Sequence, residues 1–176
     1  MKKEKKREIL KIVRIIAVAL LLLAIFKGVL ILVILMGLSF SMSYIVNNFG
    51  LRKIGLELVT FIAVITGMKY GPWIALLITF ILISYHIVAG GFLDTYILWV
   101  IPAYCLGGII AGFLPHMDVV LLGILVTLGI CGNNLFWTAM TSPGNIPNYM
   151  IYVVTNIMFN VFLFSVFGRI ILLLMI

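Results

Sequence analysis

Apolar residues fill most of this chain in long runs, and short groups of Gly, Pro, Asn and charged residues separate the runs. In lipid a helix can end only where its backbone polar groups find partners, so these groups are expected at helix ends. Six runs predict membrane-spanning helices: residues 28–46, 56–68, 73–89, 95–114, 118–139 and 149–174. The fold class expected is therefore an all-α integral membrane protein, a bundle of six transmembrane helices.

The second run, residues 56–68, is short for a span. It carries Glu57 near its start and ends at Lys69 and the turn Tyr70-Gly71-Pro72. A hydrocarbon core of about 30 Å needs about 20 helical residues, so this run spans only if it tilts into its neighbours or the bilayer is thin. A polar loop, residues 141–148, is expected before the last run.

The first 27 residues stand apart from the bundle. Residues 9–26 hold too few strictly apolar positions to cross the membrane alone. This segment lies along the interface, extends the first helix with Lys27 at its side, or forms a seventh span. The division expected is a basic cytoplasmic N-terminus with an interfacial or partly inserted helix, residues 1–27, and a six-helix substrate-binding domain, residues 28–176.

Composition supports the membrane class. The chain has 176 residues, of which 65% are hydrophobic and 10% charged, against about 25% charged in soluble proteins. Nine of the charged residues lie among the first fourteen, which leaves no room for a catalytic or nucleotide-binding domain outside the membrane. The net charge of +7 comes mainly from this cluster, which favours a cytoplasmic N-terminus rather than nucleic-acid binding. No small-residue cleavage site follows it, so it is not expected to be a removed signal peptide.

Charge also indicates the topology. Six crossings from a cytoplasmic N-terminus return Lys69 and Arg169 to the cytoplasmic side, whereas seven would place Lys69 outside. Six crossings also place the C-terminus in the cytoplasm and the loops near 48–55, 90–94 and 140–148 together on the outer side. Arg52 and Lys53 are then exceptions to the positive-inside tendency.

This topology gathers most polar residues at the outer side, where we expect a small molecule to bind. The candidate substrate-binding residues are Asn48, Arg52, Lys53, Glu57, Asp94, Tyr96, Asn133, Asn134, Trp137, Tyr149, Tyr152 and Asn156. They offer amides, aromatic rings and a few charges, which suit a polar, planar ligand.

Several of these residues also have a structural interpretation. Glu57 faces a cavity or pairs at the interface with Arg52 or Lys53. Asp94 contacts a substrate amine or caps the helix that follows it.

The amides carry the same ambiguity. Asn133 and Asn134 line a pocket with Trp137, or they hydrogen-bond between helices. The same two interpretations apply to Asn156 and to Asn160, one turn deeper.

The sequence gives little indication of a disulfide, haem, metal or catalytic site. Cys105 and Cys131 lie inside apolar runs and are expected to pack as small side chains. His86 is expected to be a hydrogen-bonded packing residue rather than a haem ligand. No catalytic, phosphate-binding or metal-binding motif is present, so neither an enzyme nor a cofactor is predicted.

Small residues predict close helix packing. Ala103, Gly107 and Ala111 recur every four positions, and Gly108 and Gly112 form a G-x-x-x-G on the neighbouring stripe. Packing inside the bundle is favoured over contact with another subunit.

Two stretches carry a family resemblance. The first runs from Gly55 through the Tyr70-Gly71-Pro72 turn to Trp73, and the second, Ala103-Tyr-Cys-Leu-Gly-Gly-Ile-Ile-Ala-Gly-Phe, follows a Gly-Gly break. Together with the ending Asn156-Ile-Met-Phe-Asn160, this pattern resembles the S components of energy-coupling factor (ECF) transporters.

The resemblance implies a substrate-capturing subunit of an ATP-driven importer in the cell membrane. It implies that a vitamin or similar micronutrient binds at the outer side and that the loop of residues 47–55 folds over it. It further implies that a transmembrane coupling protein and two ATPase subunits are the partners. The alternative is a structural scaffold of the cell envelope, resembling the rod-shape-determining membrane proteins, without a small-molecule pocket.

Overall fold

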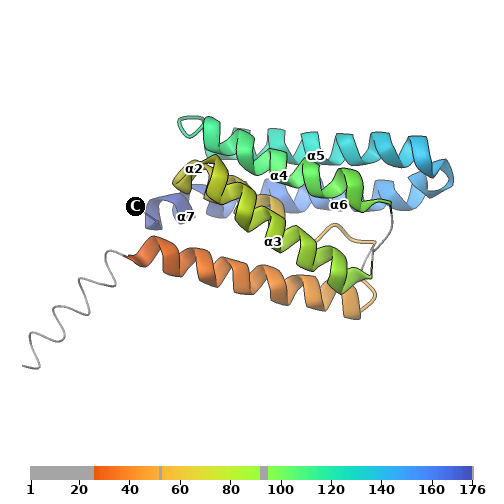
Figure 1. Ribbon diagram of the computed structural model, residues 1–176, viewed down its shortest axis with the longest axis horizontal. Coiled ribbons are helices and arrows are strands. Elements are labelled where there is room, and N and C mark those ends of the chain that lie inside the picture. Colours follow the sequence, from red (N-terminus) through yellow and green to blue (C-terminus); the bar gives the residue numbers. More distant parts are fainter. Residues whose placement is uncertain (1–25, 52, 92–94, 176) are drawn as a thin grey trace, which may run out of the picture.

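The computed structural model describes residues 26–51, 53–91 and 95–175, and this part of the chain is all helical (Figure 1). The helices are Phe26–Asn48, α2 Val59–Tyr70, α3 Pro72–Gly90, α4 Ile97–Phe113, α5 Val119–Thr141, the 3₁₀ turn Pro143–Asn145, α6 Ile146–Leu163, the π-helical turn Phe164–Gly168 and α7 Arg169–Leu174. The expectations for residues 1–25 lie outside the described residues.

Four of the described helices are long and apolar enough to cross a membrane. They are Phe26–Asn48, α3, α5 and the continuous stretch Pro143–Leu174. Two others, α2 and α4, are apolar but shorter. The expected all-helical, membrane-compatible class is therefore confirmed, while the number of crossings stays a prediction.

Local sequence signals set most helix ends. Gly71 adopts φ +87° directly before Pro72, which begins α3, and Gly91 adopts φ +67° after α3 ends. Side chains with a Cβ rarely adopt such angles, so the predicted turn and Gly-Gly break are both confirmed. The loop expected at 141–148 is much shorter, because α5 continues to Thr141 and α6 begins at Ile146. Pro147 is tolerated there because the first turn of a helix needs no donor from it.

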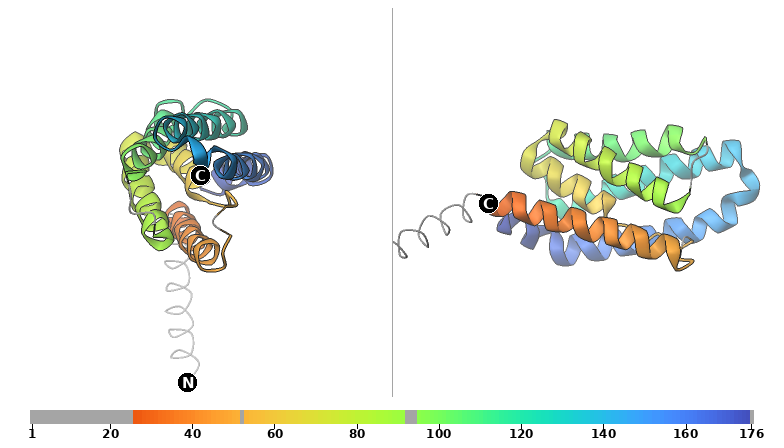
Figure 2. Two further views of the ribbon diagram at one scale, coloured as in Figure 1. Left: turned by 90° about the vertical axis from the view of Figure 1, so that its right-hand side faces the viewer. Right: turned by 60° about the horizontal axis from the view of Figure 1, so that its bottom comes forward.

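Helix α2 occupies the centre of the bundle. Every residue from Val59 to Gly67 is buried, and α2 contacts α3, α4, α5, α6 and α7. Seen end-on, the other helices curve around it (Figure 2). The outer helices expose large apolar side chains such as Leu98, Phe113 and Leu173, as expected of surfaces that face lipid.

The small-residue stripes of α4 pack inside the bundle, as predicted. A Cβ at Gly67 of α2 would lie 2.5 Å from the Gly108 carbonyl oxygen and 2.8 Å from the Gly112 nitrogen. A Cβ at Gly112 would lie 2.4 Å from the Pro72 nitrogen. The backbones of α2, α3 and α4 therefore meet directly, without side chains between them.

A π-helical turn interrupts the last helix, where the sequence predicts a continuous helix. Phe164, at its start, is fully buried, and its ring lies 5.1 Å from that of Phe61. Gly123 of α5 leaves room for this ring, since a Cβ there would approach it to 2.4 Å. The turn thus coincides with the packing of one large side chain against α2 and α5.

The helix ends that border the three loops expected on one side lie together at one end of the bundle, which we call the loop end (Figure 1). These loops join the first helix to α2, α3 to α4, and α5 to α6. The opposite end carries the Gly71 turn, the connection from α4 to α5 and the C-terminal helix α7.

At the opposite end, Asp118 caps α5 and pairs with α7. Its carboxylate accepts hydrogen bonds from the Val120 and Leu121 amides and from Arg169 Nη2 at 2.7 Å. The hydrogen bond from Arg169 is the main cause that lowers the pKa of Asp118, and the amide donors act in the same direction.

We predict that a larger side chain in place of Gly67 destabilises the protein, because Gly67 packs directly against the backbone of α4. Gly67→Ala should lower the free energy of unfolding by about 1–3 kcal/mol, because the added methyl overpacks a backbone contact. Gly129→Ala is the matched control within α5, since nothing lies within 4 Å of a Cβ there. Unfolding of both variants by SDS titration in mixed micelles measures the difference, and equal stability would contradict the packing.

We also predict a pH dependence from Asp118. Because its pKa is lowered in the folded protein, its contribution is complete above the ordinary aspartate pKa of about 3.9 and is lost as the pH falls through the lowered value. Arg169→Gln should move this loss to higher pH. Thermal unfolding between pH 3 and 7 measures it, with Lys69→Gln as control. An unchanged profile in Arg169→Gln would contradict the prediction.

Candidate functional site

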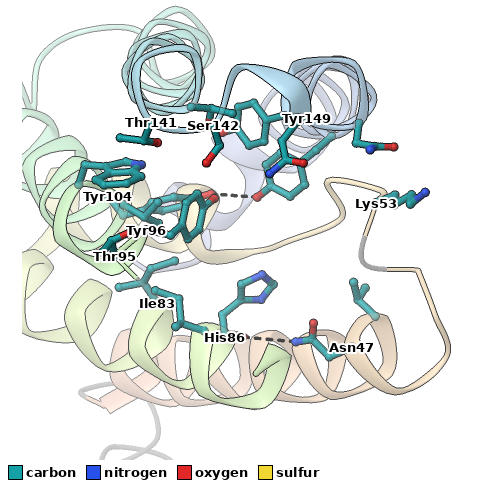
Figure 3. Close-up of a pocket in the computed structure, with 18 of the residues that line it drawn as sticks. Asn47, Lys53, Ile83, His86, Thr95, Tyr96, Tyr104, Thr141, Ser142 and Tyr149 are labelled. Carbon is teal, nitrogen blue, oxygen red and sulfur yellow. Dashed lines mark hydrogen bonds between the residues drawn. The ribbon is translucent and has the colours of Figure 1, made fainter. Parts of the chain in front are cut away.

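A cavity of about 350 Å³ opens among the helices at the loop end (Figure 3). This volume lies within the range of small-molecule pockets, about 300–1,000 Å³. Its lining comes from the first helix, the loop after it, α3, α4, the end of α5, the turn between α5 and α6, and α6 itself. The lining residues are Val46, Asn47, Lys53, Ile54, Ile83, His86, Ile87, Thr95, Tyr96, Trp99, Val100, Tyr104, Thr138, Thr141, Ser142, Asn145, Asn148, Tyr149 and Tyr152.

Helical spacing brings the aromatic lining together. Tyr96, Val100 and Tyr104 recur every four residues along α4, with Trp99 on the same side. Tyr149 and Tyr152 lie three residues apart at the start of α6, and their rings stack at 5.6 Å. The hydroxyls of Tyr104 and Tyr152 lie 3.2 Å apart and share a hydrogen bond across the two helices.

The first helix and α3 form the opposite wall. His86 Nδ1 and the Ser43 hydroxyl lie 2.9 Å apart and share a hydrogen bond. Asn47 donates to the His86 carbonyl oxygen at 3.3 Å. The expectation of a hydrogen-bonded His86 is confirmed, but its ring also lines the cavity (Figure 3).

Two buried donors of the cavity lining have no hydrogen-bond partner among the described residues: the Trp99 indole N–H and the Tyr149 hydroxyl. Tyr96 and Asn134 are the polar neighbours of the Tyr149 hydroxyl, and both donor atoms are inaccessible to solvent, so neither is open to the cavity. Unpaired buried donors are costly in proteins and are rare without a functional or solvent partner.

Below the cavity, the loop after the first helix descends into the bundle and is fastened to α6. The Gly55 amide donates to the Thr155 hydroxyl at 2.8 Å, and Asn156 donates to the Gly55 carbonyl oxygen at 3.0 Å. Asn156 lies ten residues from the start of α6, which is about 15 Å along a helix. The loop therefore reaches about half the depth of the bundle before α2 begins.

Glu57 caps the buried start of α2. Its side chain is 2% exposed, and it accepts hydrogen bonds from the Thr60 amide at 2.9 Å, the Thr60 hydroxyl at 2.6 Å and Asn156 at 3.2 Å. A carboxylate at a helix N-terminus meets the positive end of the helix dipole. This position differs from the expected one near the outer boundary, because α2 begins deep in the bundle.

The structure tests the two sequence interpretations of Glu57 only in part. Glu57 does not line the cavity, and its hydrogen bonds among the described residues join it to Thr60 and Asn156. Arg52, an expected partner, lies outside the described residues, as does Asp94.

The predicted site residues fall into two groups within the described chain. Those that line the cavity are Lys53, Tyr96, Tyr149 and Tyr152. The others do not line it: Asn48, Glu57, Asn133, Asn134, Trp137 and Asn156. Their roles in binding stay predictions.

The residues of the second group make contacts within the bundle. Asn156 contacts Gly55, Glu57 and Cys131. Asn133 donates to the Trp99 carbonyl oxygen at 3.4 Å, and Trp137 stacks on Trp99 with ring centroids 5.7 Å apart. These contacts match the interpretation of asparagines as links between helices.

Asn48 and Asn134 differ from each other in burial. Asn48 donates to the Tyr44 carbonyl oxygen at the exposed end of its own helix. Asn134 is 1% exposed, so this amide of α5 points into the bundle.

The sequence analysis misses several lining residues that a helical pattern could have found. Starting from Tyr96, a spacing of three and four residues leads to Trp99, Val100 and Tyr104 on one face of α4. No such signal exists for His86, because only the packing of α3 against the first helix brings it to the cavity.

No family model, curated protein or solved structure matches the chain. The proposals below therefore depend on the residues and geometry of this chain alone.

We predict that Asn156 is required for stability rather than only for binding. Asn156→Ala removes donors to Gly55 and Glu57 and leaves buried acceptors unpaired, so the free energy of unfolding should fall by about 2–4 kcal/mol. Asn48→Ala is the matched control, since its side chain bonds only within an exposed helix end, and it should change stability by less than about 0.5 kcal/mol. SDS unfolding in mixed micelles compares the two, and similar losses would contradict the prediction.

Proposed function

We propose that this chain is the substrate-capturing membrane subunit of an ATP-driven importer of the ECF type, which binds a vitamin-like micronutrient in the cavity at the loop end. The observation that carries the proposal is this cavity of about 350 Å³, which aromatic, amide and hydroxyl side chains line. A scaffold without a ligand has no need for such a pocket, whereas a binding subunit does.

The arrangement of the helices is consistent with this role. Six crossings, with α2 and α4 as the two shorter ones, would place both termini in the cytoplasm and the cavity at the outer face of the cell membrane. The basic cluster within the first fourteen residues favours this orientation. The cavity would then open toward the side from which a nutrient arrives.

The chain also needs partners for active uptake. Its 176 residues are nearly filled by apolar helices, with no nucleotide-binding motif among them. We therefore propose that a transmembrane coupling protein and two ATPase subunits supply the energy.

The attachment of the loop of residues 47–55 to α6 limits how the ligand would enter the cavity. The resemblance implies that residues 47–55 fold over the ligand, and Asn47 and Lys53 do line the cavity. Gly55 is fixed to α6 by hydrogen bonds and by close contact, since a Cβ there would lie 2.4 Å from the Tyr152 carbonyl oxygen. Any opening movement would therefore occur before Gly55 in the chain.

A binding test decides the proposal. The purified chain in lipid nanodiscs should retain a small molecule detectable by mass spectrometry, or show a higher melting temperature with one compound of a vitamin panel. Tyr149→Ala removes a ring that lines the cavity and should weaken binding about tenfold, as expected for a lost aromatic contact of about 1.4 kcal/mol.

Tyr44→Ala is the control for this test, because Tyr44 is 57% exposed and does not line the cavity. It should bind as the unaltered chain does. If no compound is retained or stabilises the chain, and it co-purifies with cell-envelope synthesis proteins instead of ATPases, the scaffold alternative is correct.

A further inference from the structure

His86 presents a polar ring atom on a largely apolar wall of the cavity. Its ring points from α3 into the cavity in Figure 3, and Ile83 and Ile87 of the same helix line the cavity beside it. No hydrogen bond within the described residues uses His86 Nε2, yet this atom is not one of their buried polar atoms without a partner. His86 Nε2 therefore keeps accessible surface, unlike the donors of Trp99 and Tyr149.

Ser43 of the first helix determines which nitrogen of this ring carries the proton. Ser43 is 3% exposed, so its hydroxyl proton needs an acceptor inside the protein. Ser41 and Thr127 donate to the carbonyl oxygen four residues earlier in their own helices. Ser43 makes no such bond within the described residues, where its hydroxyl instead meets His86 Nδ1 at 2.9 Å. The hydroxyl therefore donates to Nδ1, and the neutral ring carries its proton on Nε2.

Contacts between the first helix and α3 fix the direction of this N–H. Asn47 donates to the His86 carbonyl oxygen at 3.3 Å. One residue earlier in α3, the Tyr85 ring packs edge to face on Phe40, with ring centroids 4.7 Å apart. The backbone and the ring of His86 are thus both held by the first helix. A donor fixed in this way suits a binding site, because ligand pockets use a few placed polar groups to orient the ligand.

We propose that His86 is a specificity-determining residue of the capture site, and that its Nε2–H donates a hydrogen bond to an acceptor atom of the captured compound. Carbonyl oxygens, unprotonated ring nitrogens and acid oxygens are such acceptors. Ser43 is the positioning residue, since its hydroxyl keeps the proton on Nε2. This inference rests on the proposed function, because it names the group of the captured compound that the subunit recognises.

The position of the proton can be measured without a ligand. The chain has two histidines, and His116 is exposed in the connection between α4 and α5, so His116→Gln leaves His86 as the one histidine. Solid-state NMR of this variant in lipid bilayers, with isotope-labelled histidine at neutral pH, should show a protonated Nε2 and an unprotonated Nδ1. Ser43→Ala should add the other tautomer, whereas Ser41→Ala, which removes a hydroxyl bonded within its own helix, should not. A proton on Nδ1 of His86 while Ser43 is present overturns the proposal.

Three flat bicyclic probes test the direction of the hydrogen bond to the ligand. Isoquinoline offers one acceptor, indole offers one N–H donor, and naphthalene offers neither. Ligand-detected NMR with the full chain in nanodiscs measures their dissociation constants, and empty nanodiscs correct for partitioning into lipid. Isoquinoline should bind about fivefold more tightly than indole and naphthalene, as expected for one net hydrogen bond.

Variants assign this preference to His86. His86→Met keeps a side chain of similar length without a donor and should remove the preference for isoquinoline. His86→Gln, whose amide N–H reaches close to the position of Nε2, should retain part of it. His116→Gln is the matched control and should retain it in full. If His86→Met does not fold, Ser43→Ala decides, since it should reduce the preference although Ser43 does not line the cavity.

The outcomes separate this inference from the proposed function. If a probe binds and His86→Met leaves the preference unchanged, or if indole binds most tightly, the inference is overturned and the capture site stands. If no probe binds, the same variants are measured with the compound that co-purifies with the chain or stabilises it, and an unchanged affinity in His86→Met again overturns the inference. If no probe binds and no such compound exists, both the inference and the proposed function are overturned.

Discussion

The buried start of α2 is the constraint on which the rest of the structure depends. A helix that begins inside an apolar bundle exposes backbone N–H groups to surroundings without water, and these groups must be satisfied by the protein. Glu57 supplies acceptors for Thr60, and Asn156 fixes both Glu57 and the Gly55 carbonyl oxygen to α6. Without this set of hydrogen bonds the loop could not descend into the bundle, and α2 could not occupy its centre.

The short length of α2 has a consequence for the cavity. A helix of 12 residues is about 18 Å long, too short to fill a core of about 30 Å. The space above its start is closed from below by the loop at Gly55 and enclosed by the first helix, α3, α4 and α6. The cavity thus lies in the space beyond the start of α2, which a longer central helix would fill. The same feature that demands a buried cap also leaves room for a ligand.

Close backbone packing keeps this arrangement rigid. Gly67, Gly108 and Gly112 bring α2, α3 and α4 into direct contact below the cavity, and Phe164 fills the space beside Gly123. The aromatic residues of α4 and α6 are therefore attached to a well-packed lower half. The polar and aromatic side chains that line the cavity lie in the upper half.

The sequence by itself determined the all-helical class, most helix boundaries, the Gly71 and Gly91 breaks and the close packing of α4, because hydrophobic runs, Gly and Pro act locally along the chain. It also indicated Tyr96, Tyr149 and Tyr152, through their positions at helix ends. Only the tertiary structure decided that Glu57 is buried, that Asn156 is its partner 99 residues away, and that His86 lines the cavity. These roles depend on which helix faces meet and at what depth, and a one-dimensional pattern of apolar residues carries neither quantity.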